Sequence, residues 1–145
     1  MSELNNTNAR VYARFFEEIN KETSLKQYAE IFDKNVQFKD PFHDIEGLEK
    51  LYKIFEDMYI KLDNPRFKVK EIIEQNNIAY LKWDFFFSFK NSKKEESFEG
   101  VSRVEFDENN KAISHIDYWD SSSNLYEKMP ILSFFIKFIK SKINS

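Results

Sequence analysis

The chain of 145 residues contains no cysteine, two glycines and three prolines. Without cysteine it can form no disulfide, no thiolate zinc site and no cysteine nucleophile. With so few glycines it has no Gly-rich loop of the kind that holds the phosphates of a nucleotide. We therefore expect no cofactor.

A charge excess of one sign and long apolar runs are also missing. The 22 Lys and Arg residues nearly balance the 25 Asp and Glu residues, and the formal net charge is −3. Nucleic-acid-binding domains carry a basic stripe, so we expect no nucleic-acid partner. No apolar run is long enough to cross a bilayer, and residues 1–16 lack the order of a signal peptide. The expectation is a cytoplasmic protein.

Aromatic residues, in contrast, make up 17% of the chain and include sixteen phenylalanines. So many rings predict a core or a cavity with aromatic walls. The length suits one domain with a substantial core, so we expect residues 1–145 to form a single domain.

Apolar residues with helical spacing dominate the first half of the chain. They predict three helices: one over residues 11–20, a second that begins after Ser24 as its N-cap, and a third from Gly47 to about residue 62. A short strand over residues 35–39 is expected between the second and third helices, and Pro41 ends it.

From Arg66 the period changes to two, which is typical of strands. We expect four long antiparallel strands over residues 66–75, 77–89, 97–107 and 112–120, followed by a helical extension over residues 121–143. Helices that precede a strand meander indicate an α+β fold, with the helices on the concave face of a curved sheet.

Alternation along these strands assigns side chains to faces. In the strand expected over residues 66–75, the alternation places Val69 and Glu71 on one face and Ile72 on the other. In the last strand it groups three residues on one face: His115, Asp117 and Trp119.

Three stretches resemble the nuclear transport factor 2-like superfamily, in its SnoaL-like and ketosteroid-isomerase-like branch. They are YAEIFDKNVQFKDPFHDIEGLEKLYKIFEDMY, NIAYLKWDFFFSF and FEGVSRVEFDENNKAISHIDYWD. The resemblance implies a cone: a curved, mostly antiparallel sheet wraps the N-terminal helices and leaves a deep apolar pocket at one end. Members include isomerases, polyketide cyclases, dehydratases and non-catalytic binding domains. Dimers through the outer sheet face are common among them, so the resemblance also implies a homodimer.

The resemblance marks Asp40 as a candidate base. In ketosteroid isomerases the base is an Asp directly before a Pro at the end of the first strand, which Asp40-Pro41 matches. The tyrosine donor of that family falls on or near Phe15 or Phe16, and its aspartic-acid donor falls on Ser102. The oxyanion donors are thus expected to be lost. A simple Asp-Pro turn is the alternative interpretation of Asp40.

The same resemblance implies that His115 and Asp117 lie on the face of the sheet that borders the pocket. A histidine and an aspartate two residues apart on a concave face can share a hydrogen bond and divide into acid and base. The candidate catalytic residues are therefore Asp40, His115 and Asp117. A core histidine that is merely oriented by a carboxylate is the alternative, and Asp120 or Ser121 is expected to cap the last helix.

Further residues are expected to contact a ligand. They are Phe15, His43, Tyr59, Trp83, Phe85, Ser102 and Trp119, with plain core packing as the alternative for the rings. The two histidines with Asp40 or Asp117 could form a facial triad for iron. Since no ligand-spaced second pair accompanies them, we expect no metal site.

These observations predict a small-molecule pocket protein of the SnoaL-like type. It would be an isomerase, cyclase or dehydratase that uses acid–base chemistry on an apolar or carbonyl-containing ligand. The alternative is a non-catalytic ligand-binding or protein-interaction domain on the same fold. The C-terminal extension is amphipathic and basic, so it could contact a membrane. We instead expect it to cover the open end of the cone or to extend a dimer.

Overall fold

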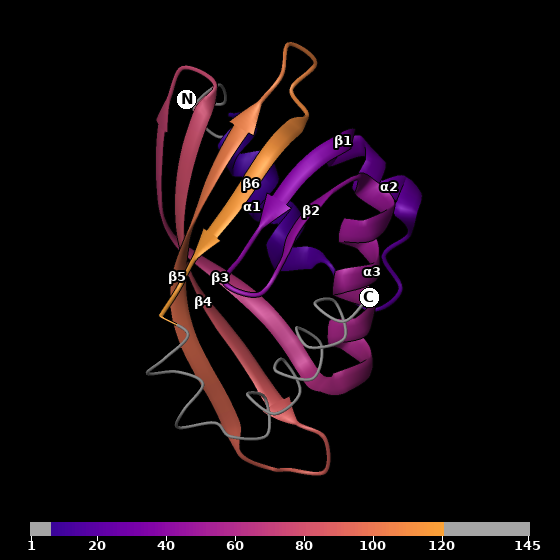
Figure 1. Ribbon diagram of the computed structural model, residues 1–145. Coiled ribbons are helices and arrows are strands. Elements are labelled where there is room, and N and C mark those ends of the chain that lie inside the picture. The colour runs from indigo at the N-terminus through magenta and orange to yellow at the C-terminus, as the bar shows by residue number, and fades with distance from the viewer. Residues whose placement is uncertain (1–6, 121–145) are drawn as a thin grey trace.

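The computed structural model describes residues 7–120, which form one curved sheet with three helices on its concave side (Figure 1). The helices are α1 (Asn8–Glu18), α2 (Leu25–Ile31) and α3 (Leu48–Lys61). The strands are β1 (Phe32–Lys39), β2 (Asp44–Glu46), β3 (Leu62–Gln75), β4 (Ile78–Phe89), β5 (Glu95–Phe106) and β6 (Ala112–Tyr118). The α+β cone expected from the sequence is confirmed, whereas the predicted C-terminal helix lies outside the described residues.

The sheet has the order β2-β1-β6-β5-β4-β3. Among the strands within residues 7–120, only β1 and β6 pair in parallel; the other neighbours are antiparallel. The parallel pairing joins the first strand of the chain to the last one. It therefore places the end of β1 beside the polar residues of β6.

Local signals in the sequence explain where the helices begin. Ser24 and Gln27 form a capping box, in which each side chain bonds the backbone N–H of the other residue. Gly47 precedes α3 with a φ of 116°, a backbone conformation that side chains with a Cβ rarely adopt. In the described part of the chain no helix is both long enough and apolar enough to cross a membrane.

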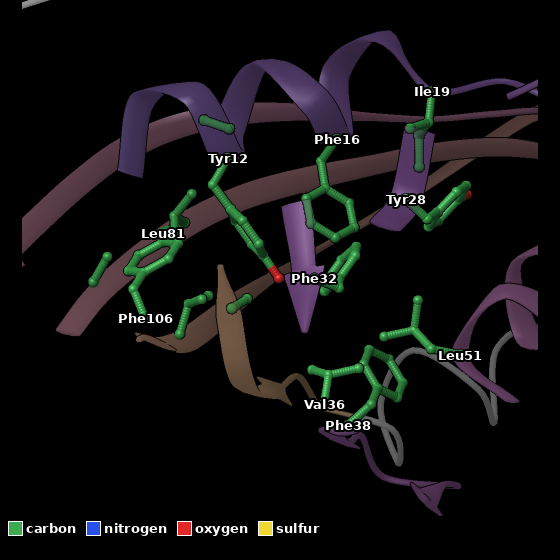
Figure 2. Packing of buried hydrophobic residues seen from close by; sticks show 14 of the residues in the cluster. Tyr12, Phe16, Ile19, Tyr28, Phe32, Val36, Phe38, Leu51, Leu81 and Phe106 are labelled. Atoms are coloured by element: carbon green, nitrogen blue, oxygen red, sulfur yellow. The ribbon is translucent and has the colours of Figure 1, made fainter. Parts of the chain in front are cut away.

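Aromatic packing holds α1 against the sheet (Figure 2). The Tyr12 ring contacts those of Phe16, Phe32 and Phe106 at centroid distances of 5.0, 5.6 and 5.5 Å. All four residues are buried. The core therefore fixes the position of Tyr12, whose hydroxyl points away from the helix.

The face assignment along β3 is wrong beyond Val69. A β-bulge between Val69 and Glu71 shifts the register, so that Ile72 pairs with Leu81 and packs against the core, while Glu71 pairs with Lys82 and is exposed. A bulge inserts one extra residue into a strand and reverses the alternation after it. The strand also begins at Leu62 rather than at Arg66.

Candidate functional site

A cavity of about 580 Å³ opens among the described residues, a volume typical of small-molecule sites. Eight aromatic residues line it: Phe38, Phe55, Phe67, Trp83, Phe85, Phe89, Phe98 and Trp119. Its ionisable lining residues are Asp40, His43, Asp57, Lys61, Lys90 and Asp117. The cavity is thus an aromatic chamber with a few carboxylates and cations.

Cross-strand register brings a carboxylate against the rings. On the concave face of the sheet, residues that face one another across β4, β5 and β6 form rows. The first row contains Leu81, Ser102 and Asp117. The next two rows pair Trp83 with Gly100 and Phe85 with Phe98. Facing residues in adjacent antiparallel strands lie close enough for their side chains to interact. Asp117 accordingly lies where the polar row meets the aromatic rows.

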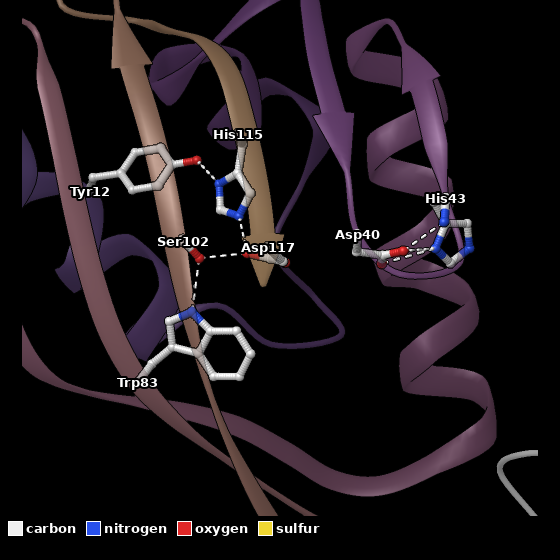
Figure 3. Close-up of polar contacts among 7 residues, drawn as sticks. All are labelled: Tyr12, Asp40, His43, Trp83, Ser102, His115 and Asp117. Carbon is white, nitrogen blue, oxygen red and sulfur yellow. Dashed lines mark hydrogen bonds and ion pairs between the residues drawn. The ribbon is translucent and has the colours of Figure 1, made fainter. Parts of the chain in front are cut away.

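A continuous chain of hydrogen bonds runs from α1 to β4 (Figure 3). The Tyr12 hydroxyl lies 2.5 Å from Nδ1 of His115, and Nε2 of His115 lies 2.6 Å from Oδ1 of Asp117. The same Oδ1 accepts a hydrogen bond from the Ser102 hydroxyl at 2.5 Å. Ser102 Oγ in turn accepts one from the Trp83 indole N–H at 2.8 Å.

The donors and acceptors of this chain fix the positions of its protons. An indole N–H only donates and a carboxylate only accepts, so Ser102 donates to Asp117 and Nε2 of His115 carries a proton. Nδ1 of His115 then accepts from the Tyr12 hydroxyl. A second proton on Nδ1 would leave this hydroxyl, in a residue only 1% exposed, with no acceptor for its own hydrogen. The geometry therefore assigns a neutral His115 with its proton on Nε2.

Burial keeps Tyr12 in its donor form. Desolvation, followed by the negative charge of Asp117, raises the pKa of Tyr12 well above its usual value of 10. The chain consequently holds a single formal charge, that of the ionised carboxylate.

The second carboxylate oxygen of Asp117, Oδ2, has no hydrogen-bond partner among the described side chains. All of the hydrogen bonds that Asp117 makes go to Oδ1. Among the described residues no buried side-chain nitrogen or oxygen lacks a partner, so Oδ2 is not buried. Asp117 lines the cavity, and its side chain is 16% exposed. A ligand can therefore reach Oδ2.

Gly100 allows the Trp83 indole to lie across β5. A Cβ at Gly100 would lie 2.5 Å from Cη2 of Trp83 and 3.1 Å from Cβ of Trp119. Any side chain at this position would thus displace the indole that bonds Ser102. The glycine is needed here for close packing.

Asp40 closes a turn and also lines the cavity. Its Oδ1 accepts hydrogen bonds from the backbone N–H groups of Phe42 and His43, at 2.7 and 2.6 Å. Nδ1 of His43 lies 2.9 Å from both carboxylate oxygens. Figure 3 shows this pair at the end of β1, apart from the chain that includes Asp117. Both interpretations of Asp40, turn residue and cavity residue, therefore apply to the same side chain.

The remaining candidate residues divide between cavity and core. Trp83, Phe85, Trp119 and His43 line the cavity. Ser102 is buried behind it, beside a void of about 20 Å³. Phe15 and Tyr59 pack against the main hydrophobic core and are not among the residues that line the cavity; burial raises the pKa of Tyr59 to about 12.

Tyr12 is the site residue that the sequence did not reveal. The resemblance places the family's tyrosine on or near Phe15 or Phe16, whereas the hydroxyl that α1 supplies belongs to Tyr12, one turn earlier. The usable signal was its place on the apolar side of the helix, since a buried tyrosine normally finds a partner for its hydroxyl. That partner is His115 and not a ligand.

Within residues 7–120, no three His, Asp or Glu side chains gather closely enough to hold a metal ion. His43 and His115 belong to two separate pairs, each with its own aspartate.

We expect Gly100→Ala to lower the free energy of unfolding by about 1–3 kcal/mol, because the added methyl overpacks the Trp83 ring. Urea denaturation measures the change. Glu99→Ala is the matched control, since Glu99 is exposed and its ion pair with Lys82 spans 3.6 Å at the surface; it should change stability by less than about 0.5 kcal/mol. A Gly100→Ala protein as stable as the parent would contradict this packing.

We expect Tyr12→Phe to cost about 1–3 kcal/mol at neutral pH, because Nδ1 of His115 loses its donor. The pKa of Tyr12 is raised in the folded state, so the protonated hydroxyl stabilises the fold fully below pH 10. Above pH 10 this stabilisation decreases, by up to about 1.4 kcal/mol per pH unit. The difference in the free energy of unfolding between the parent and Tyr12→Phe should therefore become smaller above pH 10.

Denaturation between pH 7 and pH 12 measures both effects. Tyr80→Phe is the control, since Tyr80 is exposed on the outer sheet face. A gap between the parent and Tyr12→Phe that stays constant up to pH 12 would show that folding does not hold the Tyr12 hydroxyl protonated.

Known proteins share this fold at low sequence identity. A protein of ketosteroid isomerase-like fold from Catenulispora acidiphila, solved in complex with trimethylamine, superposes with a TM-score of 0.68 at 12% identity over 82% of this chain and 89% of its own. A nuclear transport factor 2-like protein of unknown function from Burkholderia pseudomallei gives 0.69 at 13% identity over 81% and 95%. A candidate SnoaL-like polyketide cyclase from Jannaschia sp. CCS1 gives 0.69 at 10% identity over 80% and 87%.

No curated protein matches the sequence significantly. The family model of the SnoaL-like domain, however, matches residues 12–115, from Tyr12 within α1 to His115 within β6. The chain therefore belongs to the SnoaL-like domain family.

Proposed function

We propose that the protein is an enzyme that moves a proton at the carbon beside the carbonyl group of a small apolar compound. The observation that supports this most directly is Asp117, a partly exposed carboxylate in the lining of an aromatic cavity of about 580 Å³. A general base must lie within hydrogen-bond reach of the proton that it takes. An isomerase, cyclase or dehydratase would use such a group.

In this proposal Asp117 takes the proton and returns it. His115 Nε2–H and the Ser102 hydroxyl both donate to Oδ1, so they hold the carboxylate in one orientation with Oδ2 toward the ligand. Tyr12 fixes the tautomer of His115 from behind. His115, Ser102 and Tyr12 are thus positioning residues.

Asp40 takes a secondary place in the proposal. Both of its oxygens already accept hydrogen bonds from within the turn, from two backbone N–H groups and from His43. We therefore assign it the role of a fixed negative charge at the cavity wall rather than that of the base.

Ligand binding without turnover is the second candidate function. The Tyr12, Ser102 and Trp83 donors are already bonded to neighbouring side chains, so none of them is available to polarise a substrate carbonyl. Enolisation normally uses such donors. A cavity that has a base, but whose hydrogen-bond donors are already bonded to other side chains, is as consistent with ligand binding as with catalysis.

Proton exchange on a simple ketone tests the proposal without knowledge of the natural substrate. We expect the parent protein to accelerate the incorporation of deuterium beside the carbonyl of 2-tetralone in D₂O, followed by NMR. Asp117→Asn should reduce the acceleration by about 100-fold or more, the usual contribution of a general base. Its amide oxygen can still accept from His115 and Ser102, so the fold should persist.

Asp84→Asn is the matched control, because it removes the same charge from the opposite face of the sheet, where Asp84 pairs with Lys70. It should exchange at the parent rate. Equal rates for Asp117→Asn and the parent would exclude Asp117 as the base. A parent protein that exchanges no faster than buffer would favour ligand binding without turnover.

A homodimer through the outer sheet face is a separate proposal. Tyr80 and Tyr118 are 44% and 55% exposed there. In the cross-strand register Tyr118 faces Val101, and Arg103 lies between Tyr80 and Ile116. Light scattering on a sizing column should give twice the chain mass, and Tyr80→Lys with Tyr118→Lys should give a monomer. A parent protein that elutes as a monomer at high concentration would contradict the dimer.

A further inference from the structure

The carboxylates inside the cavity are paired with histidines alone. Nε2 of His115 lies 2.6 Å from Oδ1 of Asp117, and Nδ1 of His43 lies 2.9 Å from Oδ1 of Asp40. In the region from residue 7 to residue 120, neither carboxylate has a lysine or an arginine within 4 Å. A neutral histidine orients a carboxylate but does not cancel its charge.

The proton positions leave the charge of Asp117 uncompensated. His115 is neutral, because its Nδ1 accepts from Tyr12 and its Nε2–H donates to Asp117. An ionised carboxylate in apolar surroundings is costly unless a charge of opposite sign approaches it. Oδ2 bonds no described side chain, and Asp117 lines the cavity, so a ligand can bring such a charge to this oxygen.

The lysines of the lining belong to the surface side of the cavity. Lys90 is exposed and bonds Asp63 Oδ1 at 2.7 Å. Lys61 lies in the last turn of α3, and Asp57, one turn earlier on the same helix, also lines the cavity. In the part of the chain that the structure describes, neither lysine lies within 4 Å of a carboxylate oxygen of Asp40 or Asp117.

Aromatic rings line the same cavity as Asp117. The Phe98 and Trp119 rings are 4.7 Å apart, and Phe98 also contacts Trp83, at 6.2 Å. Trp83 itself is bonded to Ser102, the direct neighbour of Asp117. Indole faces are the best π partners for cations, and a cation attracted by rings and by a carboxylate at once is held strongly when desolvated.

We propose that the ligand of this cavity carries a positive charge next to an apolar body, as in a tertiary or quaternary ammonium compound. The ammonium group lies against Oδ2 of Asp117 and the Trp83 and Trp119 rings, and the apolar body fills the space beside Phe85 and Phe98. The inference rests on the cavity of the proposed function and assigns the ammonium group to the oxygen that would act there as the base. It requires no proton transfer, so it can fail or hold independently.

A pair of matched probes tests the charge alone. Benzyltrimethylammonium and neopentylbenzene have the same shape and differ by the nitrogen charge. The chain contains two tryptophans, Trp83 and Trp119, and both line the cavity, so tryptophan emission reports on binding there. Titration calorimetry supplies the affinities. We expect the cation to bind about tenfold or more tightly than its neutral isostere.

Two variants locate the effect. Asp117→Asn should weaken the cation about tenfold and leave the neutral probe within about twofold, while Asp84→Asn on the outer face should change neither. Trp119→Leu keeps the carboxylate and should weaken the cation more than the neutral probe. This second variant tests the inference even if Asp117→Asn folds poorly.

The possible results separate the two proposals. Tighter binding of the cation that depends on Asp117 and Trp119 supports the inference. Equal or tighter binding of neopentylbenzene overturns it, and so does binding of neither probe. Deuterium exchange on 2-tetralone, a neutral ketone, judges the proton-transfer proposal separately in each case.

Discussion

The hydrogen bond from Nε2–H of His115 to Oδ1 of Asp117 is the interaction on which the rest of the site depends. It connects a buried hydroxyl on α1 to a carboxylate at the cavity wall. A half-buried carboxylate needs donors to remain ionised, and His115 and Ser102 supply two on the same oxygen. The other oxygen is left for a ligand, which makes Asp117 a base, an anchor for a cation, or both.

The architecture brings these groups together from four segments of the chain. Parallel pairing of β1 with β6 sets Phe38 opposite His115, and antiparallel pairing of β5 with β6 sets Ser102 opposite Asp117. The rings that hold α1 in place aim Tyr12 at the same histidine. Because Gly100 lets the Trp83 indole cross β5, the polar chain ends at an aromatic wall. Stability and site geometry thus depend on the same contacts.

Strand alternation predicted much of this site and failed where the backbone departs from regular pairing. Along the last strand the period of two grouped His115, Asp117 and Trp119 on one face; in the structure Asp117 and Trp119 line the cavity and His115 bonds Asp117. Along β3 the bulge after Val69 reversed the faces, and neither a glycine nor a proline in the sequence marks it. Tyr12 could not be paired with His115 from sequence, because their contact depends on how α1 packs across the sheet.

Nitrogen-15 NMR of the His115 side chain tests the central claim most directly, because it reports which ring nitrogen carries a proton. At neutral pH we predict a neutral imidazole with its proton on Nε2 and with Nδ1 in the acceptor state. Tyr12→Phe should shift the Nδ1 signal, since it removes the donor to that atom. A doubly protonated ring, or a proton on Nδ1 alone, would contradict the assignment of the charge to Asp117 and with it the account of the site.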